Sequence, residues 1–154
     1  MKLYKRIIIF LTAVVTLLLT ACGSPPTLNA TYEGEIQVTD GRMNYTAYLV
    51  SDGDKVRVSL TSPESVAGLS YVFTDGELHT TLNGLDCITP ADSLPSIAFP
   101  ELLYTTFTAL DKAEHQSSED GVDTFRLGTA TVTAKNGKPL SLTAEHGNWT
   151  ITFE

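Results

Sequence analysis

The chain has 154 residues, which is enough for one domain with a single hydrophobic core but too few for two. It carries 10 basic and 18 acidic residues, a net charge of −8, and its basic residues form no cluster beyond the N-terminus. This balance excludes binding to nucleic acid, because an acidic surface repels phosphate groups.

The first 21 residues have the features of a bacterial lipoprotein signal peptide. Three cationic residues precede an apolar run over 7–19, which is too short for a membrane span of about 20 residues. The run ends in Leu19-Thr20-Ala21-Cys22, which looks like a lipobox, a motif whose cysteine is acylated before cleavage. We expect residues 1–21 to be removed. The alternatives are an ordinary secretory signal with an incidental cysteine, or a short transmembrane anchor.

Acylation of Cys22 would anchor the protein to the cell membrane or the outer membrane, on the extracytoplasmic side. Cleavage removes three of the 10 basic residues and leaves 7 against 18 acidic ones, a net charge of −11. Residues 22–30 are mainly small, polar or proline, which predicts a short lipidated tether. Residues 31–154 then form a single domain.

Cys87 is the only other cysteine, so no internal disulfide bond can form once Cys22 is acylated. Its neighbours Leu85 and Ile88 are apolar, and this context predicts that Cys87 is buried. No Lys, Arg or His lies close to it in sequence to lower the pKa of its thiol, so we expect no reactive role.

Alternating apolar and polar residues predict a series of antiparallel strands. Asx-Gly pairs such as Asp75-Gly76 and Asn83-Gly84 separate several of them and are typical of tight hairpins. The alternation covers residues 32–38, 43–49, 56–60, 69–73, 78–82, 125–127, 130–134, 140–144 and 149–153. The pattern thus predicts eight or nine strands.

One stretch follows a helical period instead. Phe99, Leu103, Phe107 and Leu110 recur at intervals of three or four residues, which places them on one face of a helix. Pro100 and the acidic residue after it suit a first helical turn. We therefore expect a helix from residue 100 to about 111, packed on the sheet by this apolar face.

Two segments, Lys55–Glu64 and Tyr71–Leu78, resemble the lipoprotein-carrier superfamily. In this family, which includes outer-membrane lipoprotein carriers and receptors and mycobacterial lipid-binding lipoproteins, an arginine-bearing strand leads to a proline and then to a strand ending in Asp-Gly. The resemblance implies a curved sheet wrapped around a cavity for acyl chains. It also implies that Arg57 is a structural latch on the helix; otherwise Arg57 is a solvated strand residue.

Pattern and resemblance together predict an α+β, mainly β fold. We expect a curved antiparallel sheet, an incomplete barrel of about eight strands, packed on one main helix, with residues 31–154 forming a half-barrel domain. The expected function is to bind or chaperone a lipid or the acyl chain of a lipoprotein between sheet and helix. The candidate ligand-binding residues are Val56, Val58, Leu60, Leu69, Tyr71, Phe73, Leu103, Phe107 and Trp149.

The alternative is that these side chains only fill a closed core. The protein would then be a structural or interaction lipoprotein of the cell envelope. The three histidines are far apart in sequence, and no catalytic motif is present. We therefore expect no enzyme activity, no catalytic or metal site, and no cofactor.

Replacing Cys22 with Ser tests the predicted anchor. We expect an unprocessed or soluble product, because the acylated sulfur is required for both cleavage and membrane attachment. Detergent-phase partitioning and the mass of the product measure this. A Cys22→Ser protein that stays in the membrane at the mature size would contradict the lipobox interpretation.

Overall fold

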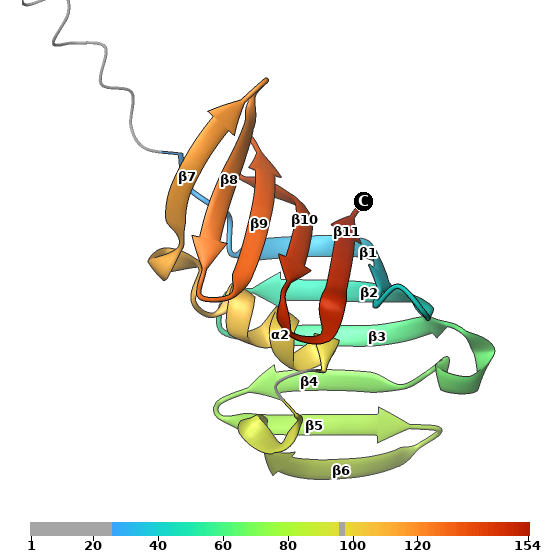
Figure 1. The fold of residues 1–154 in the computed structure, drawn as a ribbon. Coiled ribbons are helices and arrows are strands. Elements are labelled where there is room, and N and C mark those ends of the chain that lie inside the picture. The colour runs from blue at the N-terminus through green and yellow to red at the C-terminus, as the bar shows by residue number, and fades with distance from the viewer. Residues whose placement is uncertain (1–25, 96–97) are drawn as a thin grey trace, which may run out of the picture.

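The computed structural model describes residues 26–95 and 98–154, so Cys22 and the predicted signal peptide lie outside the described residues. Within them, eleven strands form one antiparallel sheet (Figure 1). The strands are β1 (Thr31–Thr39), β2 (Asn44–Asp52), β3 (Val56–Ser62), β4 (Ser70–Thr74), β5 (Glu77–Leu82), β6 (Leu85–Pro90), β7 (Glu114–Glu119), β8 (Val122–Leu127), β9 (Ala130–Lys135), β10 (Lys138–Ala144) and β11 (Trp149–Phe153).

The sheet consists of two meanders that meet along one seam. Strands β1–β6 pair in chain order, and so do β7–β11, while β1 pairs with β11 and joins the two halves. At this seam Ile36 lies opposite Phe153, and Val38 lies opposite Ile151. β6 and β7 remain as the two edges, so the curved sheet is open.

Two-residue turns connect several of the strands. Asp75–Gly76, Asn83–Gly84, Asp120–Gly121 and Asn136–Gly137 each have positive φ at both residues. This is the backbone of a type I′ turn, which Asx-Gly pairs adopt readily and whose twist matches that of the flanking strands. The hairpin turns predicted at residues 75–76 and 83–84 are confirmed.

The prediction of about eight strands is wrong, because the sheet has eleven. Each segment with an alternating pattern forms a strand, and the two strands that the pattern missed, β6 and β7, are the edges. All six residues of β7 are exposed, and in β6 only Thr89 is partly covered. A strand with no buried face has no reason to alternate apolar and polar residues, so it leaves no signal of period two.

One α-helix is described, α2 (Phe99–Phe107), which is shorter than the predicted span of 100–111. The backbone N–H and the hydroxyl of Thr108 both donate hydrogen bonds to the carbonyl oxygen of Tyr104. The next N–H, that of Ala109, bonds to the carbonyl oxygen of Thr106 only three residues back, so the α-helix ends there, about one turn early. Leu110 lies in a separate 3₁₀ turn.

The 3₁₀ segments are η1 (Glu64–Val66), η2 (Ala91–Ser93), η3 (Leu110–Lys112) and η4 (His146–Asn148). No helix among the described residues is long and apolar enough to cross a membrane.

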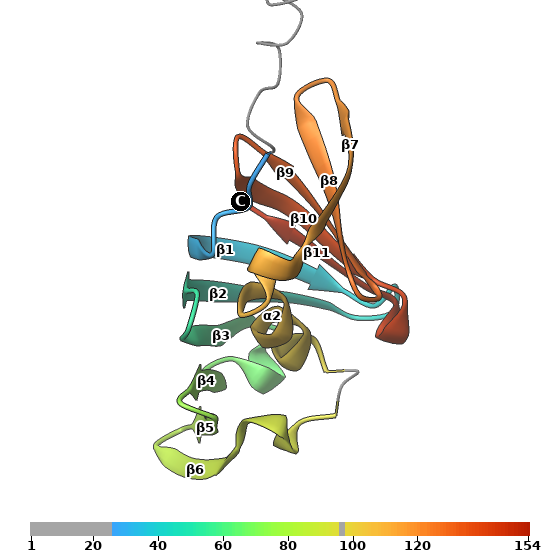
Figure 2. The same cartoon turned by 90° about the vertical axis from the view of Figure 1, so that its left-hand side faces the viewer.

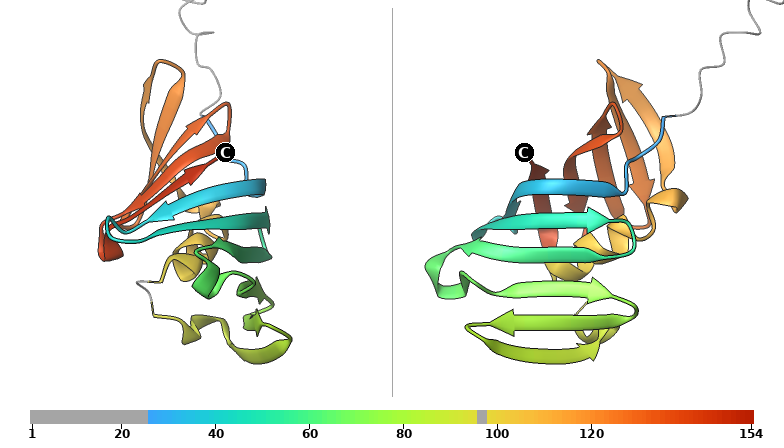
Figure 3. Two further views of the ribbon diagram at one scale, coloured as in Figure 1. Left: turned by 90° about the vertical axis from the view of Figure 1, so that its right-hand side faces the viewer. Right: turned by 180° about the vertical axis from the view of Figure 1, so that it is seen from behind.

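α2 packs across the concave face of the sheet. Figure 2 shows the strands curving around the helix, and the rear view in Figure 3 shows the convex face with α2 on its far side. Sheet and helix share one apolar core, which includes Ile36, Val38, Ala47, Leu49, Val56, Val58, Leu60, Phe73, Leu78, Leu103, Phe107, Val132, Leu142 and Ile151.

Aromatic contacts fix the helix to both meanders. Tyr104 stacks on Phe73 of β4, with ring centroids 4.6 Å apart and an interplanar angle of 9°. At the end of the helix, Phe107 lies 6.4 Å from Tyr32 of β1 and 6.1 Å from Phe153 of β11. Offset-stacked and edge-to-face pairs of this kind stabilise beyond their buried area. One helix thus connects the two halves of the sheet from its inner side.

Leu103 at the centre of α2 tests this packing. It has no exposed surface, so Leu103→Ala should lower the free energy of unfolding by about 2–5 kcal/mol through lost burial and the cavity left behind. Thr105→Ala, at an exposed position two residues on, should change the free energy by less than about 0.5 kcal/mol. Urea unfolding followed by circular dichroism measures both. Equal losses would show that the helix does not pack through this face.

Candidate functional site

The space between α2 and the sheet, where the resemblance places a ligand, is filled by protein side chains. Six of the nine predicted ligand-binding residues are buried there: Val56, Val58, Leu60, Phe73, Leu103 and Phe107. Four of these six have no exposed surface at all. An acyl chain at these positions would have to displace packed atoms of the protein.

The other three predicted residues, Leu69, Tyr71 and Trp149, are only half-buried. Tyr71 lies on β4 opposite Val58, on the same face of the sheet as the core. Leu69 directly precedes β4, and its carbonyl oxygen accepts a hydrogen bond from the backbone N–H of Leu60. The pKa of Tyr71 is raised by burial, which keeps its phenol neutral.

Trp149 belongs to a group of three rings at the start of the helix. Its ring centroid lies 5.4 Å from that of Phe99 and 6.3 Å from that of Tyr45. The centroids of Phe99 and Tyr45 are 5.6 Å apart. Phe99 comes from α2, Tyr45 from β2 and Trp149 from β11. The three rings therefore come from the helix and from both halves of the sheet.

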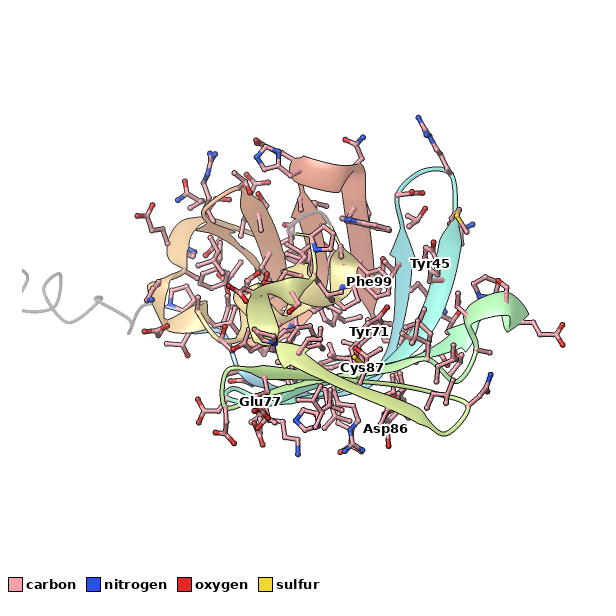
Figure 4. All side chains as sticks on the ribbon, turned by 90° about the horizontal axis from the view of Figure 1, so that it is seen from below. Tyr45, Tyr71, Glu77, Asp86, Cys87 and Phe99 are labelled. Atoms are coloured by element: carbon pink, nitrogen blue, oxygen red, sulfur yellow. The ribbon has the colours of Figure 1, made fainter. Side chains whose placement is uncertain are left out.

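The strand register places Leu69 and Tyr71 at the same end of the concave face as the three rings around Trp149. Tyr45 precedes Thr46, which lies opposite Ser62 at the end of β3, and the same end of the sheet holds Leu82, the last residue of β5. Figure 4 shows Tyr45, Tyr71 and Phe99 on the helix side of the strands. We call this region the aromatic end: Tyr45, Leu69, Tyr71, Leu82, Phe99 and Trp149.

The aromatic end contains no charged side chain, so it offers a partner mainly apolar and aromatic contacts, together with the hydroxyls of Tyr45 and Tyr71. Tyr45, Leu82 and Phe99 were not among the predicted ligand-binding residues. The sequence carried a signal for each, because the strand alternation and the helical period place them on the inner face. The sequence did not show that Tyr45 and Leu82 stay partly exposed while Phe99 is buried.

Arg57 lies on the opposite face of β3 from α2. It is exposed, whereas its neighbours Val56 and Val58 are fully buried toward the core. A latch on the helix would have to come from the concave face. Arg57 instead lines, with Lys55, two outer grooves of about 400 and 260 Å³.

The prediction that Cys87 is buried is wrong, because its side chain is exposed. Leu85 and Ile88, the neighbours that suggested burial, are exposed as well. All three lie on the edge strand β6, beyond the part of the concave face that α2 covers (Figure 1). Apolar neighbours in sequence thus do not define a buried environment on an edge strand.

Two of the three histidines contact polar side chains on the described surface. His79 Nε2 lies 3.3 Å from Glu77 Oε2, and His115 Nε2 lies 3.0 Å from the hydroxyl of Ser118. His146 is exposed in η4. Residues 26–95 and 98–154 contain no group of three or more His, Cys, Asp or Glu side chains that could hold a metal ion.

Glu101, in the first turn of α2, is the one carboxylic acid among the described residues whose pKa is raised. Burial raises the pKa of its carboxyl group, and the nearby charge of Asp92 raises it further. In the described structure, the Oε2 atom of Glu101 is buried and has no hydrogen-bond partner. The charged form of Glu101 is therefore disfavoured in the folded protein.

This shift predicts how stability changes with pH. Because the folded protein binds the Glu101 proton more tightly than the unfolded chain does, the free energy of unfolding should rise as the pH falls through the folded pKa. The gain should be complete below the ordinary value of 4.5. Glu101→Gln should flatten this dependence and stabilise the protein at neutral pH, whereas Glu119→Gln on β7 should not. Urea midpoints across this pH range provide the measurement.

No family model and no curated protein matches the chain. Among solved structures, an uncharacterized conserved protein from Thermus thermophilus is similar over 82% of this chain and 77% of its own, with a TM-score of 0.49 and 15% identity. A LolA superfamily protein from Nitrosomonas europaea is similar over 79% of this chain and 66% of its own, with a TM-score of 0.39 and 14% identity. Both are distant likenesses of fold.

Proposed function

We propose that this protein is a membrane-anchored, extracytoplasmic lipoprotein without catalytic activity, which binds an apolar ligand at the aromatic end. The ligand class is a lipid or the acyl chain of another lipoprotein. The observation that carries the proposal is the partial exposure of Leu69, Tyr71 and Trp149, which lie at one end of the concave face, next to the part that α2 closes.

Simple energetics set the size of the contact. A dissociation constant of about 1 μM corresponds to about 8 kcal/mol, and each buried methylene contributes about 0.8 kcal/mol. A micromolar complex therefore needs about ten methylenes covered, before the entropic costs of binding are counted. The six side chains of the aromatic end can cover part of an acyl chain, so we expect micromolar affinity and ready release.

The proposed anchor is compatible with a domain held close to the bilayer. The backbone N–H of Asn29 donates a hydrogen bond to the carbonyl oxygen of Gly137, and the Ser51 hydroxyl donates one to the carbonyl oxygen of Ala30. These bonds fix the segment before β1 to the domain. Six residues lie between Cys22 and Asn29, so the seven Cα–Cα steps reach at most about 25 Å.

A second candidate is an interaction lipoprotein of the cell envelope with a closed core. The observation that favours it is the complete burial of most of the predicted ligand-binding residues between α2 and the sheet. In that case the acidic surface would meet a protein or polymer, and the partly exposed rings would only cover the end of the core.

Titration with a fluorescent fatty acid separates these two candidates. We expect the domain from Pro26 onward to bind the probe saturably at micromolar concentration, with a shift in the emission of Trp149, its only tryptophan. Leu82→Glu should weaken binding at least about tenfold by placing a charge in the apolar surface. Thr81→Glu is the matched control, because its side chain lies on the convex face and it should leave binding unchanged.

Two outcomes would reject ligand binding at the aromatic end. One is the absence of saturable binding, together with no lipid in organic extracts of the native protein. The other is equal weakening by Leu82→Glu and Thr81→Glu, which would place the binding elsewhere.

A further inference from the structure

The two edges of the sheet differ in chemistry. β7 has six exposed polar residues, and an irregular register between His115 and Ser117 breaks its ladder with β8. β6 carries Leu85, which is 76% exposed, and Ile88, which is 60% exposed. These are the two most exposed large apolar side chains among the described residues. Charged groups and irregular ladders protect an edge from pairing with another strand, so the fold protects β7 and leaves β6 able to pair.

The hairpin geometry shows which backbone groups of β6 are free. Leu82 and Leu85 flank the two-residue turn Asn83–Gly84 and therefore form a hydrogen-bonded pair. Because the direction of the backbone groups alternates along a strand, Cys87 also bonds to β5. Asp86 and Ile88 direct their N–H and C=O groups away from the sheet. No described segment lies beyond this edge.

We propose that β6 pairs antiparallel with β6 of a second copy of this chain, in a two-fold register centred on Cys87. Asp86 then exchanges two hydrogen bonds with Ile88 of the second copy, and Ile88 exchanges two with its Asp86. All the free N–H groups of this stretch are satisfied. Cys87 lies opposite Cys87 in a non-hydrogen-bonded pair, where the Cα atoms are about 4.5 Å apart.

Neighbouring registers are less favourable. A shift in one direction places Asp86 opposite Asp86 of the second copy, which sets like charges side by side. A shift in the other direction places Asp86 opposite Pro90, which has no N–H to donate, so the carbonyl of Asp86 stays unpaired. A shift by a single residue would turn the side chains to the wrong face. The register centred on Cys87 satisfies both backbone pairing and charge.

The position of the edge in the molecule leaves it accessible. The segment from Pro26 to Ala30 runs beside Phe125 of β8, in the other half of the sheet, whereas β6 is the outermost strand of its own half (Figure 1). A six-residue strand pair covers much less than the roughly 1,200 Å² buried by specific stable interfaces, so the pair is weak and reversible. A disulfide between the two Cys87 side chains would show that the strand pair has formed.

Oxidation by diamide tests the pairing in the full chain, purified in mild detergent. Each diamide takes two electrons and two protons from two Cys87 thiols, and one disulfide forms across the two copies. The expected Cα separation lies within the range of roughly 4.4–6.8 Å that disulfides need. We expect a dimer on non-reducing gels, formed at a rate that rises with protein concentration and lost in Cys87→Ser.

A pair of charge variants tests the register. Ile88→Lys places an ammonium group opposite Asp86 of the second copy and should cross-link at least as fast as the unsubstituted chain. Ile88→Glu places like charges opposite each other twice and should cross-link about tenfold more slowly. Leu140 is an exposed apolar residue of β10. Leu140→Lys and Leu140→Glu change the net charge by the same amounts as the Ile88 variants, and their cross-linking rates should differ less than twofold.

The proposal is overturned if diamide gives no Cys87 dimer, or if the Ile88 variants react at the same rate. It is also overturned if the Leu140 variants differ as much as the Ile88 variants, because the effect would then come from net charge and not from strand pairing. Circular dichroism of each variant confirms that the fold is retained.

Discussion

The docking of α2 across the concave face is the contact on which the rest of the structure depends. A sheet with one apolar face needs a second layer, and this chain supplies it with a helix of nine residues. Phe73 and Tyr104 stack from opposite layers, and Phe107 reaches the strands on both sides of the seam. Without the helix, the inner face of both meanders would be exposed, and little else would hold their curvature.

The helix also determines where function is possible. Its apolar side closes the centre of the concave face, so on that face a partner can reach only the residues beyond the ends or the width of the helix. The aromatic end lies beyond its start, and the exposed strand β6 lies beyond its width. A longer helix would have covered more of the sheet and left fewer places for a partner. The early closure at Thr108 is therefore a feature that shapes the surface as well as the core.

Much of this fold could be predicted from the sequence, because burial on one face leaves a period in the chain. Strands such as β3, with Val56 and Val58 inside and Arg57 outside, carry that period plainly. The edge strands do not, since both of their faces meet water. The candidate site was predictable only in part: Leu103 and Tyr71 have the same apolar pattern, yet one is fully buried and the other half-exposed. The difference depends on how far the helix reaches, which no local pattern encodes.

The seam between β1 and β11 has a consequence for the order in which the chain can fold. Each meander is built from neighbours in sequence and can form quickly by itself. The seam cannot, because it pairs the first strand with the last, and the Tyr32 hydroxyl donates a hydrogen bond to the carbonyl oxygen of Glu154, 122 residues away. The two halves can therefore join only after β11 has been synthesised and is free to pair. A chain stalled before Trp149 would lack β11. Its two half-sheets could not pair along the seam, and their apolar inner faces would not be joined into one core.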